Sequence, residues 1–231
     1  MKKIAIVLTM ALMAVSCKFV SYTGEAKPGS GRIVCTGPVV TRTLPELTGF
    51  DAIKVNGQAD VWFTQGEAYE VSVKANEEVF DYLDFTIEEG ALVLQIKDKK
   101  NIKAETFDVY VTGPVLKDVR VNGASDFKMA DYSATEDLNV VVNGAGDFEL
   151  KRINTLSLGF VVNGAGDIDA EAIAVEKLTV EVNGTGDVEV SGTAGSAYFK
   201  VSGAGDINAR ELVCSDIQTK KSGVASIKLP R

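Results

Sequence analysis

Residues 142–147 read V-N-G-A-G-D, and close relatives of this hexapeptide recur along the chain, most densely in its second half. Copies begin at Val55, Val121, Val162, Val182 and Val201, and a degenerate copy begins at Lys221. The residues at the second position are 21, 20, 20, 19 and 20 positions apart: Asn122, Asn143, Asn163, Asn183, Ser202 and Ser222. A period near 20 residues predicts one small unit that stacks on copies of itself.

The segments between these motifs have the alternation of β-strands. Leu156, Leu158, Phe160 and Val162 alternate with small or polar residues before one motif, and residues 168–170 resume the alternation after it. Helices are excluded there, because each glycine would cost a helix interior about 1 kcal/mol. Two strands of about five residues and two corners account for one coil, which must stack to bury its apolar side.

We therefore predict an all-β chain folded as a single-stranded β-helix, or β-solenoid, with coils of about 20 residues. Antiparallel hairpins in a sandwich are the alternative, since Asn-Gly also forms hairpin turns. The nearly constant spacing favours the solenoid. We expect the Asn-Gly step of each turn to need a positive φ, as at Gly164.

An aspartate closes every turn, and its carboxylate can accept backbone N–H bonds locally. An ion site is the alternative, because Gly-Asp turns also occur in calcium-binding rolls with nine-residue repeats. Here the period is about 20, so we interpret the row as a structural ladder and expect no metal and no cofactor. The ladder comprises Asn122, Asp126, Asn143, Asp147, Asn163, Asp167, Asn183, Asp187 and Asp206.

The composition excludes several classes of function. The 231 residues include no histidine, which removes the commonest general base and metal ligand. The net charge is −8, with 32 acidic against 24 basic residues, so we expect no nucleic-acid partner.

The N-terminus indicates export. Residues 1–16 combine Lys2 and Lys3 with an apolar run too short to span a membrane, as in a signal peptide. Residues 14–17, A-V-S-C, resemble a bacterial lipoprotein processing site, which predicts lipidation of Cys17. An ordinary signal peptide with an incidental cysteine is the alternative. Removing residues 1–16 leaves 22 basic and 32 acidic residues, a net charge of −10.

The mature chain divides into a tether and one domain. Residues 17–32 are glycine-rich and predict a lipid-anchored tether. Residues 33–231 predict a single β-helix domain, with wider, irregular coils over 33–115 and regular repeats over 116–231. Cys35 and Cys214 would then lie at opposite ends of the stack, too far apart for a disulfide.

Nine of the 17 aromatic residues lie between Phe50 and Tyr110. Aromatic side chains dominate core burial, so we interpret most of them as core. A glycan-binding platform is the alternative, and its candidate ligand-face residues are Trp62, Tyr69 and Tyr82.

Three stretches resemble the bacterial head GIN domain family, whose members are proposed adhesins: G-F-D-A-I-K-V-N-G-Q-A-D-V-W-F-T-Q-G from Gly49, V-Y-V-T-G-P from Val109, and the serial N-G-A-G-D turns. The resemblance covers residues 40–230. It implies a right-handed, single-chain β-helix similar in shape to pectin lyases, without a recognised catalytic site, and a role in adhesion.

We therefore expect a lipid-anchored adhesin-like protein of the outer membrane or cell surface of a Gram-negative bacterium. It would present a solenoid face to a cell-surface glycan or protein, and it would not be an enzyme. A homo-oligomer is possible. The alternatives are a polysaccharide-acting lyase or glycosidase that uses carboxylates, and a structural factor of envelope assembly.

The Cys17→Ala substitution should abolish fractionation with membranes and leave the fold intact, because the expected anchor is an acyl chain. Cell fractionation and immunoblotting measure this. A variant that still needs detergent for extraction would contradict lipidation.

Overall fold

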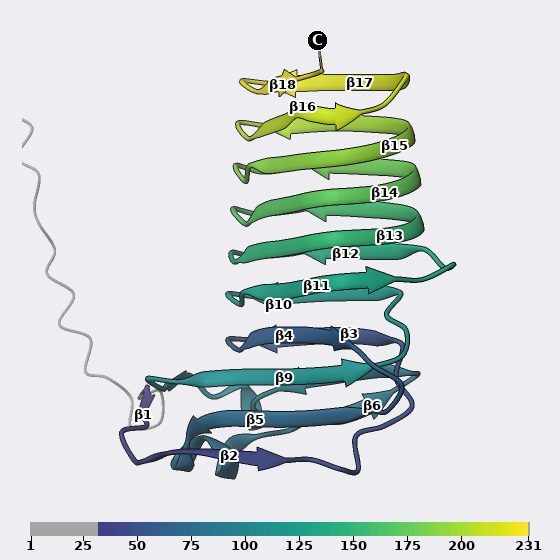
Figure 1. Ribbon diagram of the computed structural model, residues 1–231. Coiled ribbons are helices and arrows are strands. Elements are labelled where there is room, and N and C mark those ends of the chain that lie inside the picture. The colour runs from purple at the N-terminus through teal and green to yellow at the C-terminus, as the bar shows by residue number, and fades with distance from the viewer. Residues whose placement is uncertain (1–31, 231) are drawn as a thin grey trace, which may run out of the picture. The chain divides into compact units, whose positions relative to one another are not determined.

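The computed structural model describes residues 32–230. The expected signal peptide, Cys17 and all but the last residue of the expected tether lie outside the described residues. The described residues form one compact unit, a right-handed β-solenoid of about six turns (Figure 1). The predicted all-β solenoid is confirmed. Among the described residues, no helix has the length and hydropathy to cross a bilayer.

The strands of the regular coils are longer than the sequence predicted. Three strands of 16 residues each make up most of a coil: β13 (Asp147–Val162), β14 (Asp167–Val182) and β15 (Val188–Gly203). Each bends round one corner without leaving the extended ladder, at Arg152 (φ 56°), Ala172 (φ 54°) and Gly192 (φ 120°). The corner shifts the alternation, so Leu156, which we expected in the core, is 44% exposed.

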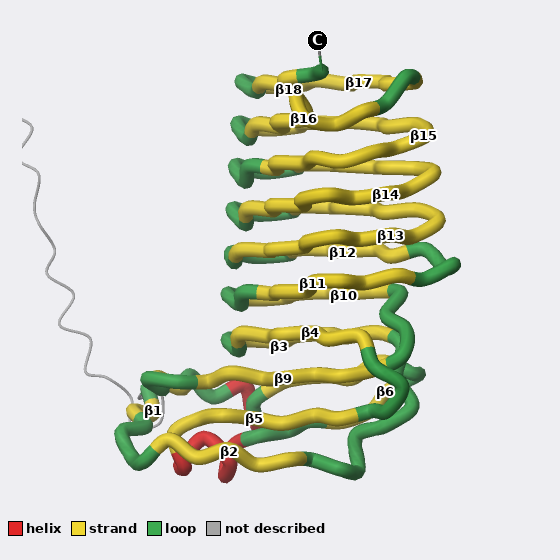
Figure 2. The backbone as a smooth tube through the Cα atoms, viewed as in Figure 1, coloured by secondary structure: helices red, strands yellow, loops and turns green. Residues whose placement is uncertain are grey.

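Two parallel sheets form the sides of the solenoid, and tight turns connect them (Figure 2). We call them the entry sheet and the exit sheet, according to whether their strands precede or follow a tight turn. The entry sheet holds the strands that lead into the turns: β3 (Ala52–Gly57), β10 (Asp118–Gly123), β12 (Leu138–Val142), the ends of β13 to β15, and β17 (Asp216–Gly223). The exit sheet holds the strands that leave them: β4 (Asp60–Gln65), β11 (Phe127–Ser133), the starts of β13 to β15, β16 (Asp206–Val213) and β18 (Ser226–Lys228).

The N-terminal section adds one wide, irregular coil under β3 and β4, and it closes the end of the stack with antiparallel strands instead of further coils. After β4 the chain turns away from the next coil, and β5 (Glu70–Asn76) runs antiparallel to β9 (Phe107–Gly113) and to β2 (Val39–Thr43). On the entry sheet, β6 (Thr86–Glu88) runs antiparallel to β7 (Ala91–Gln95), which pairs with β3.

Short elements complete this cap, which Figure 2 shows at the base of the solenoid. They are the 3-10 helices η1 (Glu77–Tyr82) and η2 (Lys97–Lys99), and the two-residue strands β1 (Ile33–Val34) and β8 (Ile102–Lys103), which pair with each other. The chain then returns through β9, under β4, and continues at β10, next to β3.

One hydrophobic core fills the solenoid from the cap to the last coil. Inward residues stack on their equivalents, as Phe127 does on Phe148 with ring centroids 5.8 Å apart. The last coil breaks these columns, because Thr219 and Lys221 pair with Phe199 and Val201. Polar residues at a terminal edge discourage further stacking.

The two described cysteines confirm the expected separation. Cys35 is buried beside β1 in the cap, and Cys214 follows β16 near the other end of the solenoid (Figure 1). Both are free. Burial, reinforced by the nearby Glu78 carboxylate, raises the pKa of the Cys35 thiol.

Close stacking of backbones explains the glycine of the Asn-Gly step from Gly123 onward. The expected positive φ is found at Gly57 (138°), where no clash would arise, and at Gly123, Gly203 and Gly223. Gly164 lies outside the positive-φ region, so the expected conformational reason is wrong at this position. A Cβ built on Gly164 would instead lie 2.0 Å from the carbonyl oxygen of Gly144 in the coil below. The same clash, at 1.9 to 2.3 Å, would occur at Gly123, Gly144, Gly184, Gly203 and Gly223.

The Gly164→Ala substitution should lower the free energy of unfolding by at least about 2 kcal/mol, because the added methyl group forces two coils apart. Thr185→Ala is the matched control, since alanine already occupies that position in neighbouring turns. We expect it to change stability by less than about 0.5 kcal/mol. Urea denaturation measures both, and equal stabilities for the two variants would contradict the stacking explanation.

Candidate functional site

The asparagines of the turns form a continuous ladder of amide hydrogen bonds along the edge of the entry sheet. Each Nδ2 donates to the Oδ1 of the asparagine one coil closer to the N-terminus, over 2.9 to 3.0 Å, through Asn183, Asn163, Asn143, Asn122 and Asn56. The ladder continues into the cap, where Asn56 donates to Gln95 (3.4 Å) and Gln95 donates to Asp84 (3.0 Å). Aligned amides of this kind polarise one another.

The aspartates form a second ladder along the edge of the exit sheet. The Asp126 carboxylate accepts the N–H of Asp147 (2.9 Å), Asp167 that of Asp187 (2.7 Å), and Asp187 that of Asp206 (2.8 Å). We expected acceptors within each carboxylate's own turn. The donors instead lie one coil further along the chain, so these carboxylates join coils to one another.

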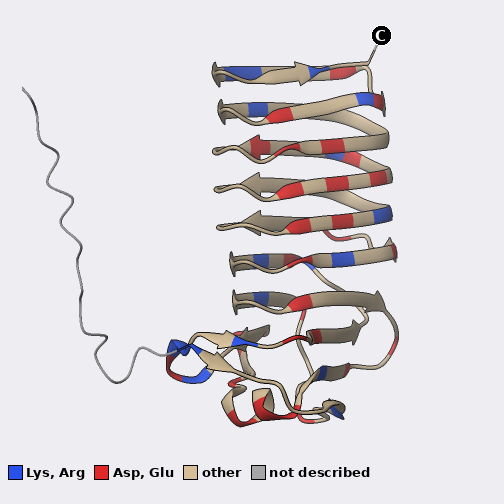
Figure 3. Cartoon of the chain, turned by 90° about the vertical axis from the view of Figure 1, so that its left-hand side faces the viewer, with Lys and Arg blue, Asp and Glu red and all other residues tan. Residues whose placement is uncertain are grey.

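The described residues contain no group of three or more acids and cysteines arranged to hold a metal ion. The acidic residues of the ladder are spread over successive coils, as Figure 3 shows on the turn side of the solenoid. Inter-coil hydrogen bonds engage the carboxylates of Asp126, Asp167, Asp187 and Asp206.

Of the three candidate aromatic residues, only Trp62 lies on an outer sheet face. It stacks on Tyr110 of the neighbouring strand β9, with ring centroids 5.1 Å apart and planes at 24°. Tyr69 packs edge-on against the buried Phe50, and Tyr82 lies at the end of η1 beneath the Lys100 ammonium group, 5.0 Å from the ring centroid. The structure does not bring Trp62, Tyr69 and Tyr82 together.

Tyr110 is the aromatic residue that sequence reasoning missed. It is 38% exposed, and on the side away from Trp62 its neighbours across the exit sheet are Ser72 and then Thr43. Both side chains are small, so one face of the Tyr110 ring stays uncovered. The alternation of β9 could have placed Tyr110 outside, but its partner strand was not readable from the sequence.

Five charged residues and one asparagine continue this outer column beyond Trp62. In register they are Lys128, Glu149, Asp169, Glu189, Asn208 and Lys228. The Lys128 ammonium group bonds Glu149 at 2.7 Å, and this bond lowers the pKa of Glu149. Partial burial, with Glu171 and Glu189 nearby, raises the pKa of Asp169. The column lines shallow grooves of about 350 and 640 Å³.

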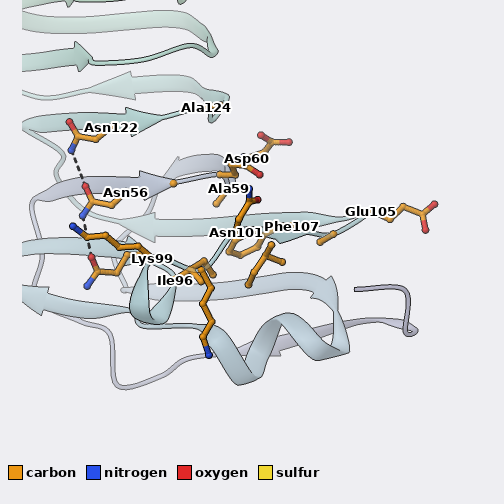
Figure 4. Close-up of a pocket in the computed structure, with 16 residues that line it drawn as sticks. Asn56, Ala59, Asp60, Ile96, Lys99, Asn101, Glu105, Phe107, Asn122 and Ala124 are labelled. Carbon is orange, nitrogen blue, oxygen red and sulfur yellow. Dashed lines mark hydrogen bonds between the residues drawn. The ribbon is translucent and has the colours of Figure 1, made fainter. Parts of the chain in front are cut away.

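A deeper cavity of about 760 Å³ lies below the first tight turn, between that turn and the η2–β8 segment (Figure 4). Its lining combines amides, lysines and apolar side chains: Asn56, Gln58, Lys99, Asn101, Asn122, Ile96, Ile102 and Phe107 are among them. Asp60 also lines it, and partial burial raises the pKa of its carboxyl. None of these residues was predicted as a site, apart from Asn122 as part of the ladder.

The family model described as "Putative auto-transporter adhesin, head GIN domain" matches residues 49–230. The chain belongs to the head GIN domain family. The resemblance seen in the sequence is therefore confirmed, and the family makes this an adhesin-type protein of the cell envelope or surface. A comparison with curated proteins found no match.

Solved structures share the GIN fold at low sequence identity. A "putative lipid binding protein" from Parabacteroides distasonis is 22% identical, with a TM-score of 0.76 over 87% of this chain and 100% of that one. A "putative adhesin" from the same species is 18% identical (TM-score 0.78; 85% and 84% covered). One from Bacteroides fragilis is 18% identical (TM-score 0.67; 85% and 99%).

The Asp167→Ala substitution should lower the free energy of unfolding by about 1 kcal/mol, because the N–H of Asp187 loses its acceptor. Asp167→Asn keeps an acceptor oxygen and should lose less. Thermal melting of the GIN protein with calcium or with chelator should give one melting temperature. A rise of many degrees with calcium, lost in Asp167→Ala, would show that the row binds metal.

Proposed function

We propose that this GIN protein is a lipid-anchored adhesin of the cell envelope that binds a glycan on its exit sheet, without catalysis. Its anchor would be the acylated Cys17, at the outer membrane or cell surface. The family supports an adhesin-type protein, and the A-V-S-C sequence supports the anchor.

The uncovered face of the Tyr110 ring is the single observation that supports a binding site on the exit sheet. An aromatic ring offers a large, rigid apolar surface at low cost in conformational entropy. Trp62 supports the ring from behind at 5.1 Å, while Ser72 and Thr43 leave the other face accessible. A sugar ring can pack its C–H face on this surface and reach the neighbouring hydroxyl and carboxylate groups.

The acidic residues of the exit sheet support binding rather than catalysis. They recur once per coil, at equivalent positions, whereas a glycosidase needs one distinctive pair of carboxylates. Several are engaged in hydrogen bonds between coils or with lysine.

A glycan array probed with the purified protein tests the proposal. Tyr110→Ala should reduce binding of the recognised glycans about ten-fold or more, because the stacking surface is lost. Tyr198→Ala removes an aromatic side chain that alternates outward on the opposite, entry sheet, and it should leave binding unchanged.

Equal binding by both variants would place the glycan elsewhere on the solenoid. No binding to any glycan would favour a protein partner or a structural role in the envelope, and would overturn the glycan proposal.

A further inference from the structure

The cavity below the first tight turn exists because the turn ladder stops there. In the regular coils two to five residues connect the two sheets, whereas residues 96–106 make this connection between β7 and β9. The pairing of β3 with β7 ends at Asn56 and Gln95, and the chain then leaves the stack through η2. A Cβ built on Gly57 would meet nothing within 4 Å, unlike those on the glycines stacked above it.

One backbone donor loses its acceptor at this point. In the turns above, the third residue donates its N–H to the glycine carbonyl one coil below, as Ala124 donates to Gly57 (3.0 Å) and Ala165 to Gly144 (2.9 Å). Gln58 holds the same position in the first turn. The carbonyl that would follow in register belongs to Ile96, and it accepts the N–H of Lys99 instead (3.2 Å). Gln58 is exposed, and among residues 32–230 no backbone carbonyl accepts its N–H, which leaves this donor open to solvent or to a ligand.

The polar side chains around the Gln58 N–H make the cavity rich in hydrogen-bond donors. Figure 4 shows the Lys99 side chain running towards Asn56, and the Asn101 amide directed towards the first turn. Lys99 forms no ion pair within the described residues. Asp98 and Lys99 both have left-handed backbones (φ 55° and 51°), a strained conformation that places the lysine at the rim.

The two carboxylates of the lining point out of the cavity. Asp60 turns towards the coil above, where it accepts the N–H of Asp126 (3.2 Å), and Glu105 extends away from the cavity (Figure 4). The Lys100 ammonium group lies 3.8 Å from Asp98 and over the ring of Tyr82. The lining therefore presents the Lys99 ammonium group, amide donors and the N–H of the exposed Gln58, in a chain of net charge −8.

We propose that this cavity binds an acidic sugar residue, such as a uronate. Its carboxylate is held by Lys99 and the Gln58 N–H, and its hydroxyls by the amides of Asn56 and Asn101. Its ring packs against Ile96 and Phe107 on the apolar wall. A volume of about 760 Å³ accommodates one or two sugar rings, and nine of the sixteen lining residues are polar or charged, which suits a hydroxyl-rich ligand. This site is separate from Tyr110 and does not depend on it.

Titration of the chain from residue 18 onward, which contains the whole compact unit, tests the proposal. The probes are sodium galacturonate, its uncharged counterpart galactose, and sodium acetate as a bare carboxylate. Isothermal calorimetry measures affinity, and ¹⁵N–¹H spectra report the Gln58 amide and the Asn101 side-chain amide. We expect galacturonate to shift both signals and to bind about ten-fold more tightly than galactose or acetate.

The Lys99→Gln variant should weaken galacturonate binding about ten-fold and leave galactose binding unchanged. Lys103→Gln is the matched control, since it removes a lysine of the same segment that does not line the cavity, and it should bind like the wild type. Equal affinity for galacturonate and galactose, or no shift at Gln58, would overturn the proposal. So would acetate binding as tightly as galacturonate. These three comparisons use the wild-type chain, so they hold even if a variant fails to fold.

Discussion

The contact between successive turns, where one glycine lies directly over another, is the constraint on which the solenoid depends. A Cβ built on any glycine of this column from Gly123 onward would lie 1.9 to 2.3 Å from a carbonyl oxygen in the coil below. Only a backbone without side chains permits that approach, and the approach brings each turn N–H within hydrogen-bond distance of the next carbonyl. The coils are thereby held in one register, in which inward residues stack in a single core.

The same register determines where the rows of asparagine and aspartate side chains lie. Because equivalent residues superpose from coil to coil, asparagine amides meet asparagine amides, and Asp126, Asp167 and Asp187 each accept the N–H of the next aspartate in the row. An acidic row that would repel as isolated charges is stabilised when each carboxylate accepts a backbone hydrogen bond. The rows are thus a consequence of the repeat, and the distinctive features lie where the repeat fails: at the cap and at the cavity under Gly57.

The sequence was sufficient for the architecture because the repeat is local and nearly invariant. The spacing of Asn122, Asn143 and Asn163 determines the coil length, and the alternation around Phe160 and Ile168 determines which side faces the core. The reason for Gly164 was mistaken, since a clash with Gly144 depends on a residue one coil away. Leu156 was misplaced because the corner at Arg152 shifts the alternation without any glycine or proline to mark it.

The candidate sites were harder to predict because they combine segments distant in sequence. Tyr110 meets Trp62 only because β9 passes under β4, an order that no local pattern reveals. Lys99 and Asn101 reach the first turn only because the chain leaves the stack after Ile96. Within the regular repeats, by contrast, neighbours are always one period apart, so contacts there follow directly from the spacing.

Amide hydrogen exchange, followed by NMR residue by residue, measures the protection of the backbone hydrogen bonds between successive turns. It also shows where this series of bonds ends. The N–H groups of Ala145, Ala165, Thr185 and Ala204 each donate to a glycine carbonyl in the coil below, over 2.9 to 3.0 Å, and they should exchange slowly. The N–H of Gln58, at the same position in the first turn, should exchange at close to the rate of an unprotected amide. Protection of Gln58 equal to that of Ala165, or rapid exchange at all five positions, would contradict a solenoid held together by stacked turns that ends above the cavity.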